Sequence, residues 1–215
     1  MTRQRSIRVI VGLLLSLGAG LLPLGAWGRT YSGLGRLVGN EVLWWVAVVI
    51  ILLYVAFAER RPFASIGFRK PTIFDLFLAV IAGILMVAGI VFIYNIVFPA
   101  LHLTMNAGTM RYLLETPFWY RLMLVTRAAF AEELLFRGYP IERMGELIGS
   151  RMLAAVVSCA VFTYAHLANW GVAQLIVAGY GGVILTALYL WRRNLWVNML
   201  AHWIADGAGF LLPHG

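Results

Sequence analysis

The chain has 215 residues, of which 62% are hydrophobic and only 12% are charged. Soluble domains carry roughly a quarter charged residues, so this composition excludes an ordinary soluble protein and indicates a single polytopic membrane domain over residues 1–215. The net charge of +8 does not indicate a nucleic-acid partner, because most basic residues lie at the ends of apolar runs, where they anchor helices at the cytoplasmic face of a bilayer.

Apolar stretches of spanning length predict an all-α protein with about seven transmembrane helices, within a range of six to eight. They cover residues 9–27, 42–58, 73–99, 117–139, 152–168, 171–191 and 194–212. The first stretch follows a basic start but precedes no clear cleavage site, so we interpret it as a retained helix rather than a signal peptide. Seven helices in order place the main basic clusters on one side, which predicts a cytoplasmic N-terminus and an external C-terminus.

Two adjacent carboxylates, Glu132 and Glu133, lie inside the fourth apolar stretch. An ionisable group at membrane depth costs roughly 2.5–3.5 kcal/mol on insertion scales and usually marks function. On a helix, Glu133 and Arg137 are four residues apart and can pair, which leaves Glu132 unpaired and able to act as a general base. The alternative is a buried ion pair that only fixes helix packing.

Later stretches supply the partners that such a base needs. His166 follows Phe162 by one helical turn, and His202 precedes Asp206 by four residues, so that this carboxylate can orient the imidazole or join it at a site. Each feature alone is also explained by helix packing. If the three segments converge, Glu132, His166 and His202 form either a water-activating site or a set of ligands for zinc or another divalent metal.

At these residues the sequence resembles the CPBP family of intramembrane proteases, which is related to the type II CAAX prenyl endopeptidase and to bacteriocin-processing and self-immunity proteins. The resemblance covers a core of about residues 118–212. Its motifs are Glu-Glu-x-x-x-Arg, Phe-x-x-x-His and His-x-x-x-Asn or Asp, which are met here by Glu132, Glu133 and Arg137, by Phe162 and His166, and by His202 and Asp206.

The resemblance implies a glutamate-dependent endopeptidase. Glu132 and His166 would activate water, His202 and Asp206 would stabilise the oxyanion, and Glu133 and Arg137 would be structural. Two asparagines, Asn169 and Asn198, are expected to contact the catalytic side chains rather than the substrate. An ionised Asp206 would repel an oxyanion, so it must be protonated, orient His202 or ligate a metal.

The expected substrate is a membrane-associated peptide or protein, lipidated or plain, in a bacterial or archaeal cell membrane. One alternative is a non-catalytic immunity or partner-binding protein of the same fold. A proton-coupled transporter would also use buried ionisable groups, but no inverted repeat supports that reading.

Overall fold

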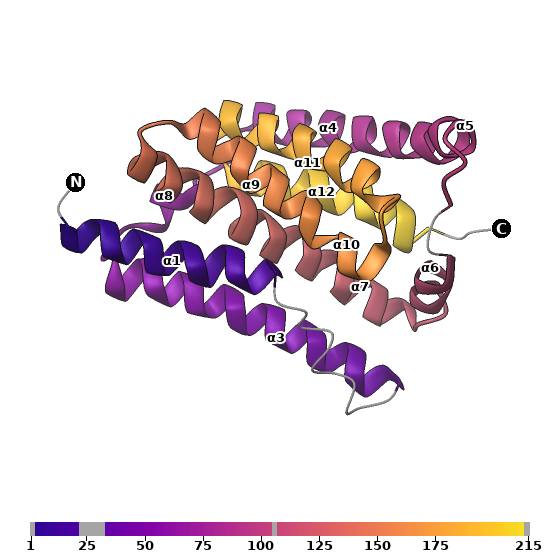
Figure 1. The fold of residues 1–215 in the computed structure, drawn as a ribbon, viewed down its shortest axis with the longest axis horizontal. Helices are drawn as coiled ribbons and strands as arrows, with labels where there is room; N and C mark the ends of the chain where they lie inside the picture. The colour runs from indigo at the N-terminus through magenta and orange to yellow at the C-terminus, as the bar shows by residue number, and fades with distance from the viewer. Residues whose placement is uncertain (1–2, 22–32, 105–106, 213–215) are drawn as a thin grey trace.

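The computed structural model describes residues 3–21, 33–104 and 107–212, and this part of the chain is helical without strands (Figure 1). The predicted all-α class is therefore confirmed. The helices are α1 (Arg3–Leu21), α3 (Gly33–Leu53), α4 (Ile73–Phe92), α5 (Phe98–Ala100), α6 (Ala107–Leu114), α7 (Phe118–Arg127), α8 (Tyr139–Ile148), α9 (Arg151–Ala165), α10 (Leu167–Trp170), α11 (Gln174–Arg192) and α12 (Leu195–Phe210).

Wider, π-helical turns extend or join several of these helices. One follows α3 (Tyr54–Ala58), one joins α4 to α5 (Ile93–Val97), and two join α7 to α8 (Ala128–Glu132 and Leu134–Gly138). All of the residues that flank the two turns between α7 and α8 keep right-handed helical dihedrals. Residues 118–148 therefore form one long, continuous helical segment.

Four helical segments in the described ranges are long and apolar enough to cross a membrane, which fits an integral membrane protein. They are Arg3–Leu21, Leu37–Ala58, Ile73–Ala100 and Gln174–Arg192. The predicted count of seven is not confirmed, because α9 and α12 have only 15 and 16 residues, below the roughly 17–25 that a spanning helix uses. The remaining predicted stretch, 117–139, holds two π-helical turns and the buried charges of Arg127, Glu133 and Arg137.

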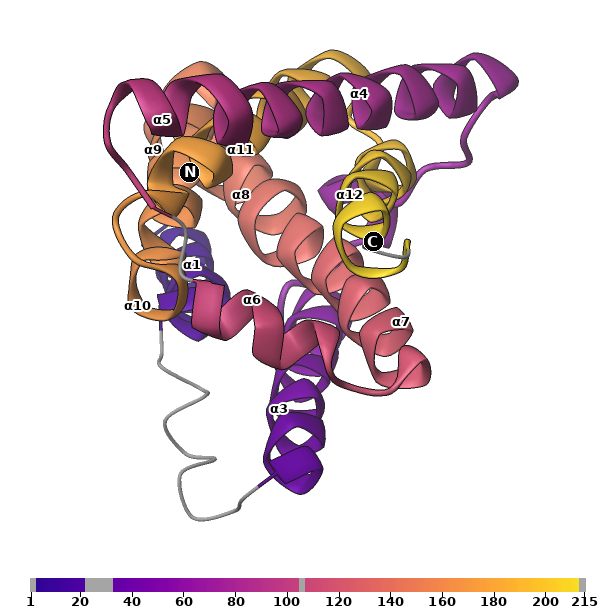
Figure 2. The same ribbon diagram turned by 90° about the vertical axis from the view of Figure 1, so that its right-hand side faces the viewer.

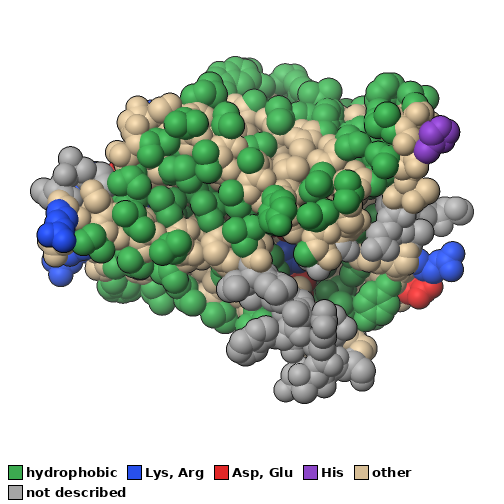
Figure 3. All heavy atoms as spheres, in the orientation of Figure 1, with side chains coloured by type: hydrophobic (Ala, Val, Ile, Leu, Met, Phe, Trp, Pro, Cys, Tyr) green, Lys and Arg blue, Asp and Glu red, His purple; other side chains and the backbone are tan. Residues whose placement is uncertain are grey.

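The long helices lie side by side, and the long segment of α7 and α8 passes through the middle of the bundle (Figures 1 and 2). On one side it packs against α1 and α3, and on the other against α9 and α12. The face in Figure 3 is mostly free of charged side chains between its two ends, and hydrophobic side chains cover much of it. Exposed apolar side chains such as Phe77 and Ile84 on α4 are expected of a surface that faces lipid.

A network of ion pairs at the C-terminal end of α8 connects the basic clusters of the sequence. Glu142, Arg143 and Glu146 on α8 all take part in it. Their partners come from α1, from the segment after α3, from the start of α9 and from the turn between α11 and α12, and are Arg5, Glu59, Arg61, Arg151 and Arg193. Four of the basic clusters predicted to share one side thus meet at one end of the bundle, and the side of the membrane that this end faces stays a prediction.

Gly138 allows two other segments to approach the long helix closely. A Cβ atom at this position would lie 2.5 Å from the carbonyl oxygen of Ile66 and 2.7 Å from a methyl group of Leu195. The amide of Leu195 also donates to the carbonyl of Gly67 at 2.8 Å. The missing side chain therefore lets the turn after α3 and the start of α12 pack against the segment that carries the two glutamates.

We expect Gly138→Ala to lower the free energy of unfolding by about 1–3 kcal/mol, because the backbone oxygen of Ile66 cannot move aside as a flexible side chain would. The measurement is thermal unfolding of the detergent-purified variant. Gly18→Ala is the matched control, since nothing lies within 4 Å of a Cβ there and alanine favours a helix. Equal unfolding temperatures for Gly138→Ala and the wild type would contradict the close approach.

Candidate active site

The two glutamates lie where the long helix widens. Glu132 ends the first π-helical turn, Glu133 stands between the two turns, and Arg137 lies in the second. Such wide turns occur often at functional sites, because the inserted residue changes the direction in which the side chains point. The side chain of Glu133 is fully buried, whereas that of Glu132 is 14% exposed, so the two carboxylates have different environments.

Three donors surround the buried carboxylate of Glu133. Its Oε1 lies 2.9 Å from Nη1 of Arg137 and 2.9 Å from Nδ1 of His202, and its Oε2 accepts from Nδ2 of Asn198 at 3.0 Å. The predicted pairing of Glu133 with Arg137 is confirmed. The contacts with Asn198 and His202 show that Glu133 also connects the long helix to α12.

His202 lies between two carboxylates. While Nδ1 faces Glu133, Nε2 lies 3.5 Å from Oδ2 of Asp206, whose side chain is 30% exposed. Carboxylate oxygens only accept hydrogen bonds when ionised, so this arrangement requires either protons on both ring nitrogens or a protonated Asp206. Asp206 is thus close enough to His202 to orient its ring.

Glu132 is not unpaired, and in this respect the sequence-based expectation is wrong. Its Oε1 lies 3.3 Å from Nη1 of Arg127, five residues earlier, which is the hydrogen-bond spacing of a π-helix. Arg127 also contacts Glu41 of α3, with Nε 2.6 Å from Oε2 and Nη2 3.1 Å from Oε1, and the hydroxyl of Tyr120 donates to the same carboxylate at 3.4 Å.

Arg127 and Glu41 are thus site neighbours that our reading of the sequence missed. Both are nearly fully buried. The signal that could have revealed them is the presence of one acidic and one basic residue in or beside two different apolar stretches, because charges at that depth require a partner.

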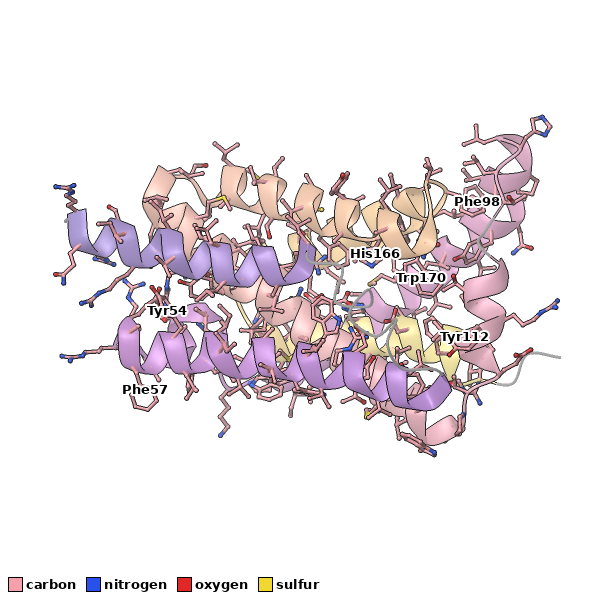
Figure 4. The ribbon with its side chains drawn as sticks, turned by 60° about the horizontal axis from the view of Figure 1, so that its bottom comes forward. Tyr54, Phe57, Phe98, Tyr112, His166 and Trp170 are labelled. Atoms are coloured by element: carbon pink, nitrogen blue, oxygen red, sulfur yellow. The ribbon has the colours of Figure 1, made fainter. Side chains whose placement is uncertain are left out.

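His166 is connected to Arg137 through Phe162. Its Nδ1 lies 2.8 Å from the carbonyl oxygen of Phe162, and the two rings meet edge to face at 4.7 Å. The guanidinium of Arg137 lies 3.9 Å above the ring of Phe162, which also packs on Phe136. In the described part of the chain His166 forms no ion pair with either glutamate; it lies beyond the end of α9, beside Trp170 (Figure 4).

Two further predictions concern Asn169 and a metal. The side chain of Asn169 lies outside the described residues. Within the described ranges, no group of three or more His, Cys, Asp or Glu side chains is arranged to hold a metal ion. Glu132, His166 and His202 are therefore not brought together as a ligand set in this arrangement, and the use of a metal stays a prediction.

We expect Glu133→Gln to destabilise the protein by about 3 kcal/mol or more, because Arg137 would be left as a buried charge without a counter-ion. The neighbouring substitution Glu132→Gln is the matched control. It should cost less than about 1 kcal/mol, since Arg127 keeps the carboxylate of Glu41. Unfolding temperatures of the two purified variants test this difference, and equal losses would show that the two carboxylates do not have separate roles in packing.

Comparison with known proteins agrees with the three motifs. Residues 114–208 match the family model described as type II CAAX prenyl endopeptidase Rce1-like, a segment that holds all of the motifs. No curated protein and no solved structure gives a significant match to the chain. Over this segment the chain is similar to the type II CAAX prenyl endopeptidase Rce1-like family, which is consistent with the CPBP family that the motifs resemble.

Proposed function

We propose that the protein is an intramembrane endopeptidase that hydrolyses a peptide bond of a membrane-associated substrate. The family match supports a protease of the CAAX type. The observation that carries the proposal is the bond between the buried Glu133 and His202, which holds α12 beside the partly exposed Glu132. A base and an imidazole from different segments are the groups that water activation requires.

We assign the general base to Glu132. Its Oε1 faces Arg127, and the carboxylate keeps enough exposure to meet a water. That water attacks the carbonyl carbon of the scissile bond while Glu132 takes one of its protons. Transfer of this proton to the departing amine restores the carboxylate.

The contact of His166 with Phe162 determines which ring nitrogen can accept a hydrogen bond. A backbone carbonyl only accepts, so the contact with Phe162 requires a proton on Nδ1 of His166. In the neutral ring this leaves the lone pair on Nε2. We infer that Nε2 orients the attacking water together with Glu132.

We assign His202 and Asp206 to the carbonyl oxygen of the scissile bond, which becomes negatively charged when water attacks. With Nδ1 donating to Glu133, a proton on Nε2 of His202 would point toward Asp206 and the open side of the site. A donor that is fixed before the reaction can stabilise the negative charge that develops on the carbonyl oxygen. In this proposal Glu133 is a positioning residue for His202 as well as a structural one.

We expect Glu132→Gln to lower peptide hydrolysis at least about 100-fold while the unfolding temperature changes little. The assay uses a panel of quenched fluorescent peptides, prenylated and plain, with detergent-purified protein, with and without a chelator. Glu115→Gln removes an exposed carboxylate elsewhere and is the control.

Each arm of this experiment has a distinct meaning. Turnover that survives in Glu132→Gln would exclude this residue as the base. Turnover lost on chelation would instead move Glu132, His166 and His202 into a metal shell. A folded wild type without turnover over the whole panel would favour the non-catalytic immunity or partner-binding alternative.

We expect Asp206→Asn to keep activity within about tenfold, because the amide can still orient His202 and carries no charge that would repel an oxyanion. Asp206→Ala should lose more than about tenfold, since the imidazole then has only one partner. The measurement is the ratio of kcat for the two variants on one substrate. Equal activity in both would mean that Asp206 does not orient His202.

A further inference from the structure

We propose that a pocket between α1 and the turn after α3 binds the phosphate of an anionic phospholipid headgroup. This site lies at the end of the bundle that holds the ion-pair network, away from the two glutamates, and does not depend on the proposed function. The cavity has a volume of about 190 Å³ and is lined by Gln4, Arg5, Arg8, Val9, Glu59 and Arg61.

The walls of this pocket are fixed by contacts between the two segments. The hydroxyl of Tyr54 donates to the carbonyl oxygen of Arg8 at 2.7 Å, which ties the end of α3 to α1. Figure 4 shows Tyr54 at this end of α3. The turn itself is closed by backbone bonds from Glu59 to Tyr54 and from Arg61 to Val55. The cavity is therefore part of the folded structure and far exceeds the roughly 10–15 Å³ that one water needs.

Both carboxylates near the pocket already have hydrogen-bond or ion-pair partners. Glu59 accepts from the hydroxyl of Tyr139 at 2.8 Å and from Arg143 at 2.7 Å. Glu146, behind the cavity, lies within 3.1 Å of both Arg5 and Arg61. Burial alone would raise the pKa of Glu146, but the hydrogen bond and charge of Arg61 outweigh it and lower that pKa below its ordinary value.

The pocket keeps an excess of positive charge. Three arginines, Arg5, Arg8 and Arg61, line the cavity, and Arg143 pairs with Glu59 beside it. With Glu146, which pairs with Arg5 and Arg61, two carboxylates thus stand against four guanidinium groups. Within the described residues no carboxylate pairs with the guanidinium of Arg8, although this side chain lines the cavity. Guanidinium groups bind phosphate oxygens strongly through paired N–H donors, so Arg8 is the residue that we expect to hold the ligand.

The position of the pocket identifies a lipid as the source of the phosphate. α1 is apolar beyond its basic first turns, and exposed side chains such as Leu14 and Leu15 continue from the pocket along the same helix. A headgroup held by Arg8 would place its acyl chains beside this surface. Basic residues at a membrane edge attract anionic lipids in the same way.

The test measures lipid binding to wild-type protein and to two single-charge variants in detergent. Arg8→Gln removes the unpaired guanidinium, and Arg3→Gln removes one exposed charge of the same helix outside the pocket. Phosphatidylglycerol, phosphatidylcholine and free glycerol phosphate are titrated separately. Native mass spectrometry counts bound lipid, and the shift of the unfolding temperature gives an apparent affinity.

We expect phosphatidylglycerol to bind more tightly than phosphatidylcholine, and Arg8→Gln to weaken that binding about fivefold or more while Arg3→Gln stays within about twofold. Equal losses in the two variants would overturn the proposal in favour of diffuse charge attraction. Binding unchanged in Arg8→Gln would overturn it as well. If glycerol phosphate raised the unfolding temperature as much as phosphatidylglycerol at a comparable concentration, the proposal of a lipid ligand would be overturned in favour of a soluble anion.

Discussion

The arrangement of the whole site depends on the buried carboxylate of Glu133. A charge without access to water is tolerated only when donors replace its hydration, and here Arg137, Asn198 and His202 do so. Because two of these donors belong to α12, the same bonds that satisfy Glu133 also fix α12 against the long helix. The carboxylate of Glu133 therefore sets the orientation of the His202 ring, and that orientation directs Nε2 toward Asp206.

Two adjacent carboxylates can exist at this depth because each faces a different guanidinium. Arg137 neutralises Glu133, while Arg127 is shared between Glu132 and Glu41. Among the described residues, the ion pairs of the site join four carboxylates, Asp206 included, to two arginines and His202, so an approach to neutrality requires protons on His202 or on a carboxylate. A site that must hold a proton close to its reacting groups is suited to the proton transfers that hydrolysis requires.

The sequence predicts the contacts that depend on helical spacing and misses those that depend on packing. Glu133 with Arg137, and His202 with Asp206, are four residues apart and meet on any α-helix. Arg127 and Glu132 are five apart and meet only because the chain forms a π-helical turn, while Glu41 joins them only because α3 packs on α7. Neither the π-helical turn nor the packing of α3 on α7 leaves a pattern in the apolar stretches. For the same reason, hydropathy alone does not determine the number of transmembrane helices.

The long helix connects the depth of the site to the network at its end. Glu133 precedes Arg143 by ten residues, so it lies roughly 15 Å along the helix from the charged end of α8, at a rise of about 1.5 Å per residue. A bilayer core is about 30 Å thick, which places the glutamates deep within it if that charged end lies at the interface. At this depth a substrate backbone has its polar groups paired within a helix, and an attacking water cannot reach a carbonyl carbon held in that way. If the site acts as we propose, the substrate must therefore enter as an unwound segment or a free chain end, whose exposed amide groups would find donors and acceptors at His166, His202 and Asp206.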